Sequence, residues 1–205
     1  QVDNQLAVAA LATGECLDGC TYEGGFALHL AAAGRPVLGI CNGFQALVKA
    51  GLIPGADEAG VWSKRRPATL THNASGQFEC RWVTLAPVRN SRSLFTRGLT
   101  ELIDCPVAHG EGRVVPRDAD ALAGLEAAGQ VALRYVQADG GPAAWPANPN
   151  GSANDIAALC NPAGNVMGLM PHPEDHLRAA QHPQRLGGRL GLALFTAGVR
   201  HARQD

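Results

Sequence analysis

Two short motifs, far apart in the sequence, carry the residue types of a thiol-dependent hydrolase. Cys41 follows the apolar run 36–40; after the apolar stretch 165–169, His172 lies between two prolines and Glu174 follows the second. A thiol nucleophile needs a base that takes its proton, and the base needs a neighbour that fixes its tautomer. We therefore predict that Cys41 is a nucleophile, that His172 is its base, and that Glu174 orients the base.

The residues around Cys41 predict a sharp turn between a buried strand at 36–40 and a helix at 44–50. The glycines at positions 39 and 43 are expected to allow tight packing at this turn. The positive end of the following helix favours the thiolate of Cys41. The backbone N–H of Asn42 is then placed to stabilise an oxyanion.

Each motif also has an ordinary structural interpretation. A cysteine at the end of a strand is often only a small buried apolar residue. A His-Pro-Glu segment is often a surface turn. The presence of both motifs in one chain favours the hydrolase.

Five segments, in order along the chain, resemble one known family. The chain resembles the glutaminase subunits of phosphoribosylformylglycinamidine synthase, which are class I glutamine amidotransferases, from about Arg35 to the C-terminus. The Asn-Gly-Phe-Gln that follows Cys41 and the His-Gly-Glu-Gly at 109–112 separate this subfamily from other class I amidotransferases. The five segments are residues 37–45, 70–83, 108–112, 148–152 and 170–174.

The resemblance implies an α/β domain of flavodoxin-like type, with a doubly wound, mostly parallel sheet flanked by helices. It implies hydrolysis of glutamine through a cysteine thioester, with Cys41, His172 and Glu174 as the triad. The ammonia would pass to a synthetase subunit, which converts formylglycinamide ribonucleotide to formylglycinamidine ribonucleotide in purine biosynthesis. ATP and Mg²⁺ are expected on that partner, a small accessory subunit is expected in the complex, and no cofactor or metal is expected in this chain.

The resemblance also places five residues near the glutamine site or the partner. Without it, the four other than Gln45 would be interpreted as ordinary side chains, such as a turn asparagine, a surface arginine paired with a carboxylate and a satisfied histidine. These residues are Gln45, Asn73, Arg81, His109 and Glu111.

The sequence departs from the family before the nucleophile. Family members carry a longer segment there, with a Pro-Gly-Gly-Phe-Ser-Tyr-Gly-Asp motif whose glycine supplies a second oxyanion donor. Only 40 residues precede Cys41, and Gly24-Gly25-Phe26 echoes the motif without its continuation. We expect that the first sheet strands and this second donor are missing. This leaves open the alternative of a catalytically silent subunit that only binds the synthetase.

The composition fits one globular domain over residues 1–205. Hydrophobic residues make up 46% of the chain, charged residues 17%, and the formal net charge is −1. This charge argues against binding to nucleic acid or to an anionic membrane. Without a signal peptide or a long apolar run, and with six scattered cysteines, we expect a cytoplasmic protein with free thiols. Cys16 and Cys20 are read as small buried residues rather than as metal ligands.

The remaining patterns predict further elements without an internal repeat. Helices are predicted at 5–12, 26–33, 117–128 and 186–202. Strands are predicted at 78–85, 130–136 and 165–170, and loops at 14–25 and 140–151.

Overall fold

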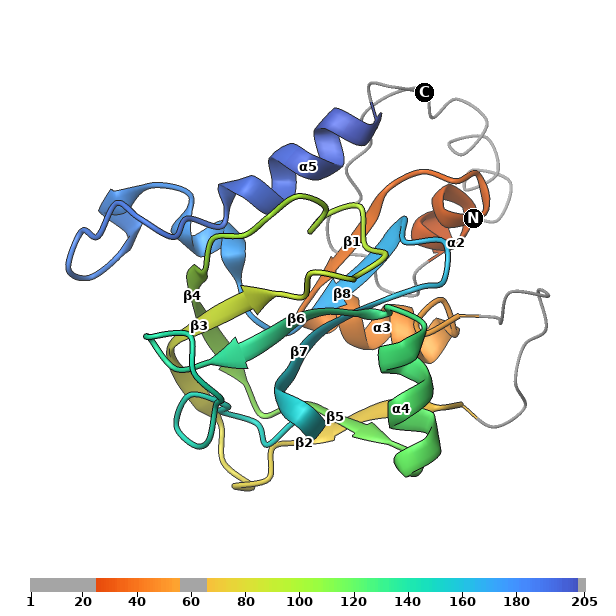
Figure 1. Cartoon of the computed structure of the whole chain (residues 1–205), viewed down its shortest axis with the longest axis horizontal. Coiled ribbons are helices and arrows are strands. Elements are labelled where there is room, and N and C mark those ends of the chain that lie inside the picture. The colour runs from red at the N-terminus through yellow and green to blue at the C-terminus, as the bar shows by residue number, and fades with distance from the viewer. Residues whose placement is uncertain (1–24, 56–65, 203–205) are drawn as a thin grey trace.

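The structure is a computed structural model that describes residues 25–55 and 66–202. A six-stranded sheet lies at its centre, with a second sheet of two strands below it and helices on both sides (Figure 1). The order in the large sheet is β1-β8-β7-β6-β3-β4. Its strands are β1 (Val37–Ile40), β3 (Glu79–Pro87), β4 (Ile103–His109), β6 (Val131–Val136), β7 (Ile156–Cys160) and β8 (Val166–Leu169). The small sheet pairs β2 (Ala68–His72) with β5 (Glu111–Pro116).

The helices come from segments with the expected end signals. Helix α3 ends at Gly51, whose φ of 83° is readily adopted by glycine, and α4 begins after Asp118, whose side chain accepts a hydrogen bond from the Ala121 N–H. No described helix is long and apolar enough to cross a membrane. The α-helices are α2 (Gly25–Ala32), α3 (Asn42–Ala50), α4 (Ala119–Ala127) and α5 (Leu192–Ala202). Three short 3-10 helices are η1 (Ala153–Asp155), η2 (Pro173–His176) and η3 (Ala179–Gln181).

The α/β class and the flanking helices are confirmed, but the sheet is mixed rather than mostly parallel in the part that the structure describes. Only β1 and β8 pair in parallel, and the other four pairings are antiparallel. The reason lies in the connections. β7 and β8 are joined by the short turn 161–165, whereas parallel neighbours require a long crossover.

A hydrophobic cluster covers each face of the large sheet. Along β1, Val37 belongs to one cluster and the next residue, Leu38, packs against the other, as the alternation of a strand requires. The first cluster includes Leu47 of α3 and Leu125 of α4, and the second includes Leu194 of α5. At β7 and β8 both faces are covered, which explains why these two strands are buried along their whole length.

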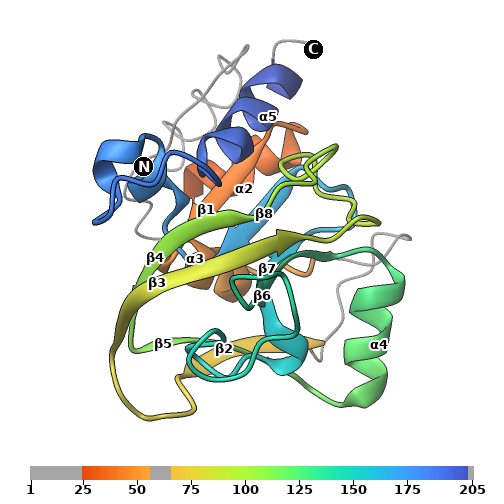
Figure 2. The same cartoon turned by 60° about the vertical axis from the view of Figure 1, so that its left-hand side comes forward.

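The β3–β4 ladder curves toward the small sheet, as Figure 2 shows. Residue Gly110 separates β4 from β5, and Glu79 pairs with His109 just before this bend. β4 is an outer strand of the large sheet and contains Pro106. Proline lacks a backbone N–H, so it is tolerated in a strand mainly at such an edge.

Most of the predicted elements that fall in the described residues are confirmed, with shifted ends. The helix predicted at 186–202 begins only at Leu192. The glycines at 187, 188 and 191 precede it, and a Cβ at Gly191 would lie 2.2 Å from the Pro173 oxygen. The helix predicted at 5–12 and nearly all of the loop at 14–25 lie outside the described residues. Strands β2, β4, β5 and β7 were not predicted.

Candidate active site

The predicted triad residues lie at one edge of the large sheet. Because β1 and β8 run parallel, Cys41 and His172 follow neighbouring strands at the same end. β4 ends at this edge as well, since two antiparallel steps relate it to β6 and two more relate β6 to β8. The carboxyl edge of a wound α/β sheet is the usual place for a ligand site.

Cys41 occupies a strained turn between β1 and α3. Its φ of 52° and ψ of −108° lie outside the regions that a non-glycine residue prefers. Its backbone N–H donates to the Leu169 carbonyl of β8 at 2.8 Å, which ties the turn to the neighbouring strand. The cysteine is half-buried. The geometry is that of the nucleophile elbow predicted from the sequence.

Only one of the two flanking glycines is required for packing. A Cβ at Gly39 would lie 2.5 Å from Leu47 Cδ1 and 2.7 Å from the backbone carbon of Gly43, so any side chain there would separate strand and helix. A Cβ at Gly43 would meet nothing within 4 Å. The expectation that both glycines permit tight packing is therefore right for Gly39 and wrong for Gly43. A third glycine matters instead, because Phe44 fills the space above Gly168, where a Cβ would lie 2.0 Å from its ring.

His172 and Glu174 form the expected pair at the start of η2. The Nδ1 of His172 lies 2.7 Å from Glu174 Oε1, so Nδ1–H donates to the carboxylate and Nε2 is left for a second partner. The Cys41 side chain has the largest influence on the pKa of His172, so the thiol lies beside the imidazole. The backbone N–H of His172 donates to the Pro106 carbonyl of β4 at 2.8 Å. The structure thus brings all three predicted residues together.

The electrostatics of the pair favour a charged imidazole. The hydrogen bond with Cys41 and then the one with Glu174 raise the pKa of His172 from 6.5 to about 10, against the opposing effect of burial. At neutral pH the ring is therefore an imidazolium in contact with a thiol and a carboxylate. This is the environment that stabilises a reactive thiolate.

Asn42 is the first residue of α3, directly after Cys41. The N–H groups of the first helical turn have no acceptor within the helix, so the Asn42 N–H is available to an oxyanion. Gly24 of the segment that echoes the second oxyanion motif lies outside the described residues. The expectation that this second donor is missing therefore stays a prediction.

Gln45 and Glu111 meet although they are distant in sequence. Gln45 Nε2 donates to Glu111 Oε2 at 3.1 Å, and His72 Nδ1 lies 3.4 Å from Glu111 Oε1. Gln45 is half-buried, one turn along α3. His72 and Glu111 are exposed and lie on the β2–β5 ladder. The predicted place of Gln45 and Glu111 beside the glutamine site stays a prediction.

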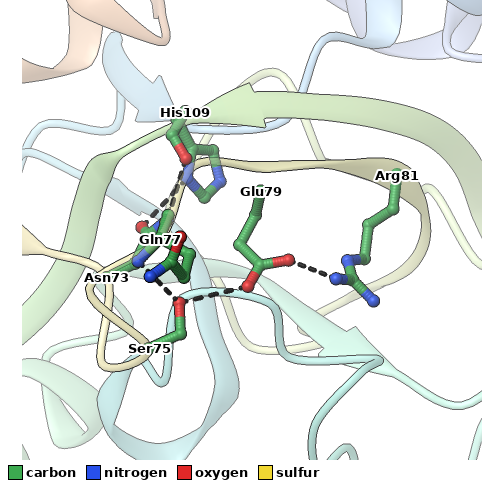
Figure 3. A network of polar contacts seen from close by, with 6 residues as sticks. All are labelled: Asn73, Ser75, Gln77, Glu79, Arg81 and His109. Atoms are coloured by element: carbon green, nitrogen blue, oxygen red, sulfur yellow. Dashed lines mark hydrogen bonds and ion pairs between the residues drawn. The ribbon is translucent and has the colours of Figure 1, made fainter.

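Asn73 and His109 are buried against each other (Figure 3). The Asn73 amide donates to the backbone oxygens of Gln77 and His109, and its Oδ1 lies 3.1 Å from His109 Nδ1. Burial and, less strongly, the nearby charge of His172 lower the pKa of His109 to about 4. His109 is therefore neutral at pH 7, with Nδ1–H donating to Asn73. The polar atoms of Asn73 are engaged within the protein, which is typical of a supporting residue.

Arg81 lies in the same network, on β3. It forms an ion pair with the buried Glu79, whose other oxygen accepts from Ser75 Oγ at 3.1 Å (Figure 3). The guanidinium lies 5.2 Å from the ring centre of the exposed Trp145. Arg81 also borders a cavity of about 710 Å³, which Cys41 does not line. The structure therefore makes Glu79 the main partner of Arg81.

Sequence reasoning missed several residues that shape this site. Glu79 lies in the segment 70–83 but was not singled out, because a buried counter-ion has no separate signal in the sequence; Pro106 acts through its backbone oxygen. Tyr135, whose pKa is raised by burial and then by the neighbouring Cys105 and Cys41 among other groups, is part of the wall near the nucleophile. His176 lies four residues after His172, just beyond the segment 170–174. That spacing was the available signal in the sequence.

A metal ion would compete with the triad for the same atoms. Among the described residues, His172, Glu174 and Asp175 offer ligand atoms within 4.8 Å of one another. Two of these three are the predicted base and its orienting carboxylate, already joined by a 2.7 Å bond. The arrangement is accounted for by the triad, and no metal is needed to explain it.

The strained turn at Cys41 lies in an α/β fold, and comparison with known proteins shows the family. The chain belongs to the CobB/CobQ-like glutamine amidotransferase domain family, whose model matches residues 23–201.

Within that family, the chain is similar to phosphoribosylformylglycinamidine synthase subunits PurQ. It is 42% identical over 187 residues to that of Treponema denticola, covering 84% of this chain and 69% of the relative. It is 50% identical over 169 residues to that of Thermomicrobium roseum, covering 82% and 63%. The chain thus spans about two thirds of the length of these curated relatives. The solved structure of PurLQS from Thermotoga maritima matches 95% of this chain and 71% of that one, at 31% identity and a TM-score of 0.62. The family predicted from the five motifs is confirmed.

Proposed function

We propose that this chain is the glutaminase subunit of a phosphoribosylformylglycinamidine synthase, and that Cys41, His172 and Glu174 are its catalytic residues. The observation that carries the proposal is the strained turn at Cys41 beside His172, whose Nδ1 is held by Glu174. The similarity to PurQ subunits over more than four fifths of the chain supports the substrate and the pathway.

The geometry suggests the order of the steps. The Cys41 thiolate attacks the side-chain amide carbon of glutamine, and the resulting oxyanion accepts a hydrogen bond from the Asn42 N–H. The His172 imidazolium gives its Nε2 proton to the leaving nitrogen, which departs as ammonia and leaves a γ-glutamyl thioester on Cys41. His172 then takes a proton from water, whose oxygen attacks the thioester carbon and releases glutamate.

Glutamine recognition is assigned to the residues around this edge of the sheet. Gln45 and Glu111, joined at 3.1 Å, are the proposed polar contacts of the substrate, and His109 and Asn73 support the wall behind them. Arg81 is proposed to lie nearer the partner, because it borders a cavity away from Cys41 and stacks beside the exposed Trp145.

The proposal includes a synthetase partner and a small accessory subunit, in keeping with the likeness to PurLQS. ATP and Mg²⁺ belong to the partner, and ammonia is the product that passes between the two. A cytoplasmic location follows from this pathway and is consistent with the free cysteines at positions 41, 80, 105 and 160.

Ammonia release at saturating glutamine tests the proposal. We expect low activity for the protein alone and a rise of at least roughly tenfold, about 1.4 kcal/mol of transition-state stabilisation, when the synthetase and its nucleotide substrates are added. Full activity in isolation would refute control by docking. No activity under either condition, with binding to the synthetase intact, would instead favour a silent subunit.

A further inference from the structure

The segment that carries His172 and Glu174 is docked on the open edge of β4. β4 pairs only with β3 in the large sheet, so the backbone groups on its other side are not used by another strand and bind loop residues instead, as when Asp104 N–H donates to the Arg189 carbonyl at 2.8 Å. The Pro106 carbonyl on that side accepts from the backbone N–H of His172 at 2.8 Å. The Asp104 carbonyl, two residues earlier, accepts from the side chain of His176 at 2.7 Å. One edge of one strand therefore holds both ends of the catalytic turn.

His176 is fully buried, and each of its ring nitrogens faces a backbone carbonyl. Nδ1 lies 2.7 Å from the Asp104 oxygen, and Nε2 lies 3.1 Å from the Leu186 oxygen. A carbonyl oxygen can only accept, so the shorter contact identifies Nδ1–H as the donor to β4, and Nε2 donates as well when the ring is protonated. The side chain thus links the turn to the strand on one side and to the following loop on the other.

Aromatic rings fix the orientation of this imidazole. The ring of Trp82 meets it edge-on with centroids 5.1 Å apart, and the ring of His182 lies 5.3 Å away and 4.3 Å from Trp82. The charged pair Asp104 and Arg189, 3.8 Å apart, flanks the same loop. His176 is therefore held on its edges by hydrogen bonds and on its faces by packing.

The backbone around His176 leaves the turn little freedom. Gly191 N–H donates to the His176 carbonyl at 2.9 Å, and Asp175 N–H donates to the His172 carbonyl at 3.1 Å. Since a Cβ at Gly191 would lie 2.2 Å from the Pro173 oxygen, the loop and the turn are in direct contact. A change at His176 is transmitted to His172 through a rigid turn of four residues.

We infer that His176 is a positioning residue for the proposed reaction: its bond to the Asp104 carbonyl sets the direction in which η2 presents His172 to Cys41. The inference rests on the proposed function of Cys41 and His172, and it adds a residue that does not touch the substrate. A positioning error of about 1 Å in a catalytic group reduces rate by about a hundredfold.

Two polar variants separate the two bonds of His176. In His176→Asn, the amide nitrogen takes the place of Nδ1 and keeps the bond to Asp104. In His176→Gln, the amide takes the place of Nε2 and keeps only the bond to Leu186. His176→Phe fills the space without either bond. His182→Phe is the matched control, because it keeps the aromatic contact with Trp82 and does not alter the bonds to β4.

The readout is the rate at which iodoacetamide alkylates Cys41 in the full-length protein, measured at several pH values. Peptide mass mapping identifies the modified cysteine. We expect His176→Asn and His182→Phe to match the parent protein. We expect alkylation of Cys41 to be at least about tenfold slower in His176→Gln and His176→Phe than in the parent protein. These variants should also need a higher pH, because the thiolate loses its aligned imidazolium.

The outcomes distinguish this inference from the proposed function. A loss of thermal stability in His176→Phe with an unchanged pH profile would mean a purely structural role and would overturn the inference. If His176→Phe does not fold, equal behaviour of the Asn and Gln variants would overturn it as well. Failure of the proposed function would appear differently, as an absence of Cys41 alkylation in the parent protein itself.

Discussion

Replacing Glu174 with glutamine should impair glutamine hydrolysis without abolishing it. The variant keeps the shape of the side chain but removes the charge that accepts the 2.7 Å bond from His172 Nδ1. A hydrogen bond to a charged group contributes about 1.5–3 kcal/mol. The Glu174 side chain is 38% exposed, so solvent screening places the loss near the lower limit, about 1.5–2 kcal/mol. We therefore expect turnover to fall about ten- to thirtyfold.

The same change should alter the pH dependence in a defined direction. The pKa of His172 is raised to about 10. The bond to Cys41 contributes most to this rise, and the bond to Glu174 comes second. Without the carboxylate, this pKa falls back toward 6.5, so the imidazolium that protonates the leaving ammonia is lost at lower pH. The alkaline decline in activity should move to lower pH.

The raised pKa of His172 also makes the stability of the folded protein depend on pH in a defined direction. A raised pKa in the folded state stabilises the fold below the unfolded value of 6.5, and this contribution is lost as the pH rises through about 10. The destabilisation by Glu174→Gln should thus be greatest at and below neutral pH and should vanish above pH 10. Urea unfolding at several pH values measures it.

The assay is ammonia release from saturating glutamine, with the synthetase present, between about pH 6 and about pH 10. Asp175→Asn is the control, because Asp175 is an exposed neighbouring carboxylate that does not contribute to the raised pKa of His172. A Glu174→Gln profile identical to that of the parent would refute the orienting role. A loss as severe as that of Cys41→Ala would show that Glu174 does more than orient the base.

Three further predictions follow from the contacts. Cys41→Ala and His172→Ala should each abolish ammonia release, because nucleophile and base act as one unit; near-normal turnover in His172→Ala would show that the triad is assigned wrongly. Gly39→Ala should destabilise the fold by about 1–3 kcal/mol in urea unfolding, since its Cβ would lie 2.5 Å from Leu47, whereas Gly43→Ala should fold normally. Asn73→Ala should lower the unfolding free energy by about 1–3 kcal/mol, because it leaves the Nδ1–H of His109 without an acceptor; an unchanged stability would indicate that the network is not structural.

The local elements of the site could be predicted from the sequence because their signals are local. An apolar run before Cys41 and a periodic pattern after it predict a strand and a helix, and the structure has both. A glycine at position 51 follows the predicted helix 44–50. In the structure this glycine ends the helix with a left-handed backbone. The five motifs further predict the family, which the comparisons confirm.

The sheet could not be predicted in the same way, because pairing depends on residues that are distant in sequence. β4 was hidden by Pro106, which is compatible with a strand only because β4 lies at the edge. β7 is rich in alanine, and its burial on both faces removes the alternation that identifies a strand. The antiparallel pairing of these strands with β3 and β8 is what makes the sheet mixed.

The contacts of the site residues were equally out of reach. Nothing in the sequence indicates that the Asn73 amide is used within the protein or that Glu79, rather than a surface acid, pairs with Arg81. The support of His172 by the Pro106 carbonyl involves only backbone atoms and therefore carries no side-chain signal.

The most direct test of the central claim is covalent labelling with an alkylating glutamine analogue. The full-length protein is treated with the analogue, and the modified cysteine is identified by peptide mass mapping. Cys105 and Cys160 serve as internal references, because burial raises the pKa of Cys105 well above its usual value and that of Cys160 to about 11. We predict one label on Cys41, blocked by excess glutamine and absent in Cys41→Ala. Label on the exposed Cys80 or on any other cysteine, with Cys41 unmodified, would contradict the assignment of Cys41 as the nucleophile.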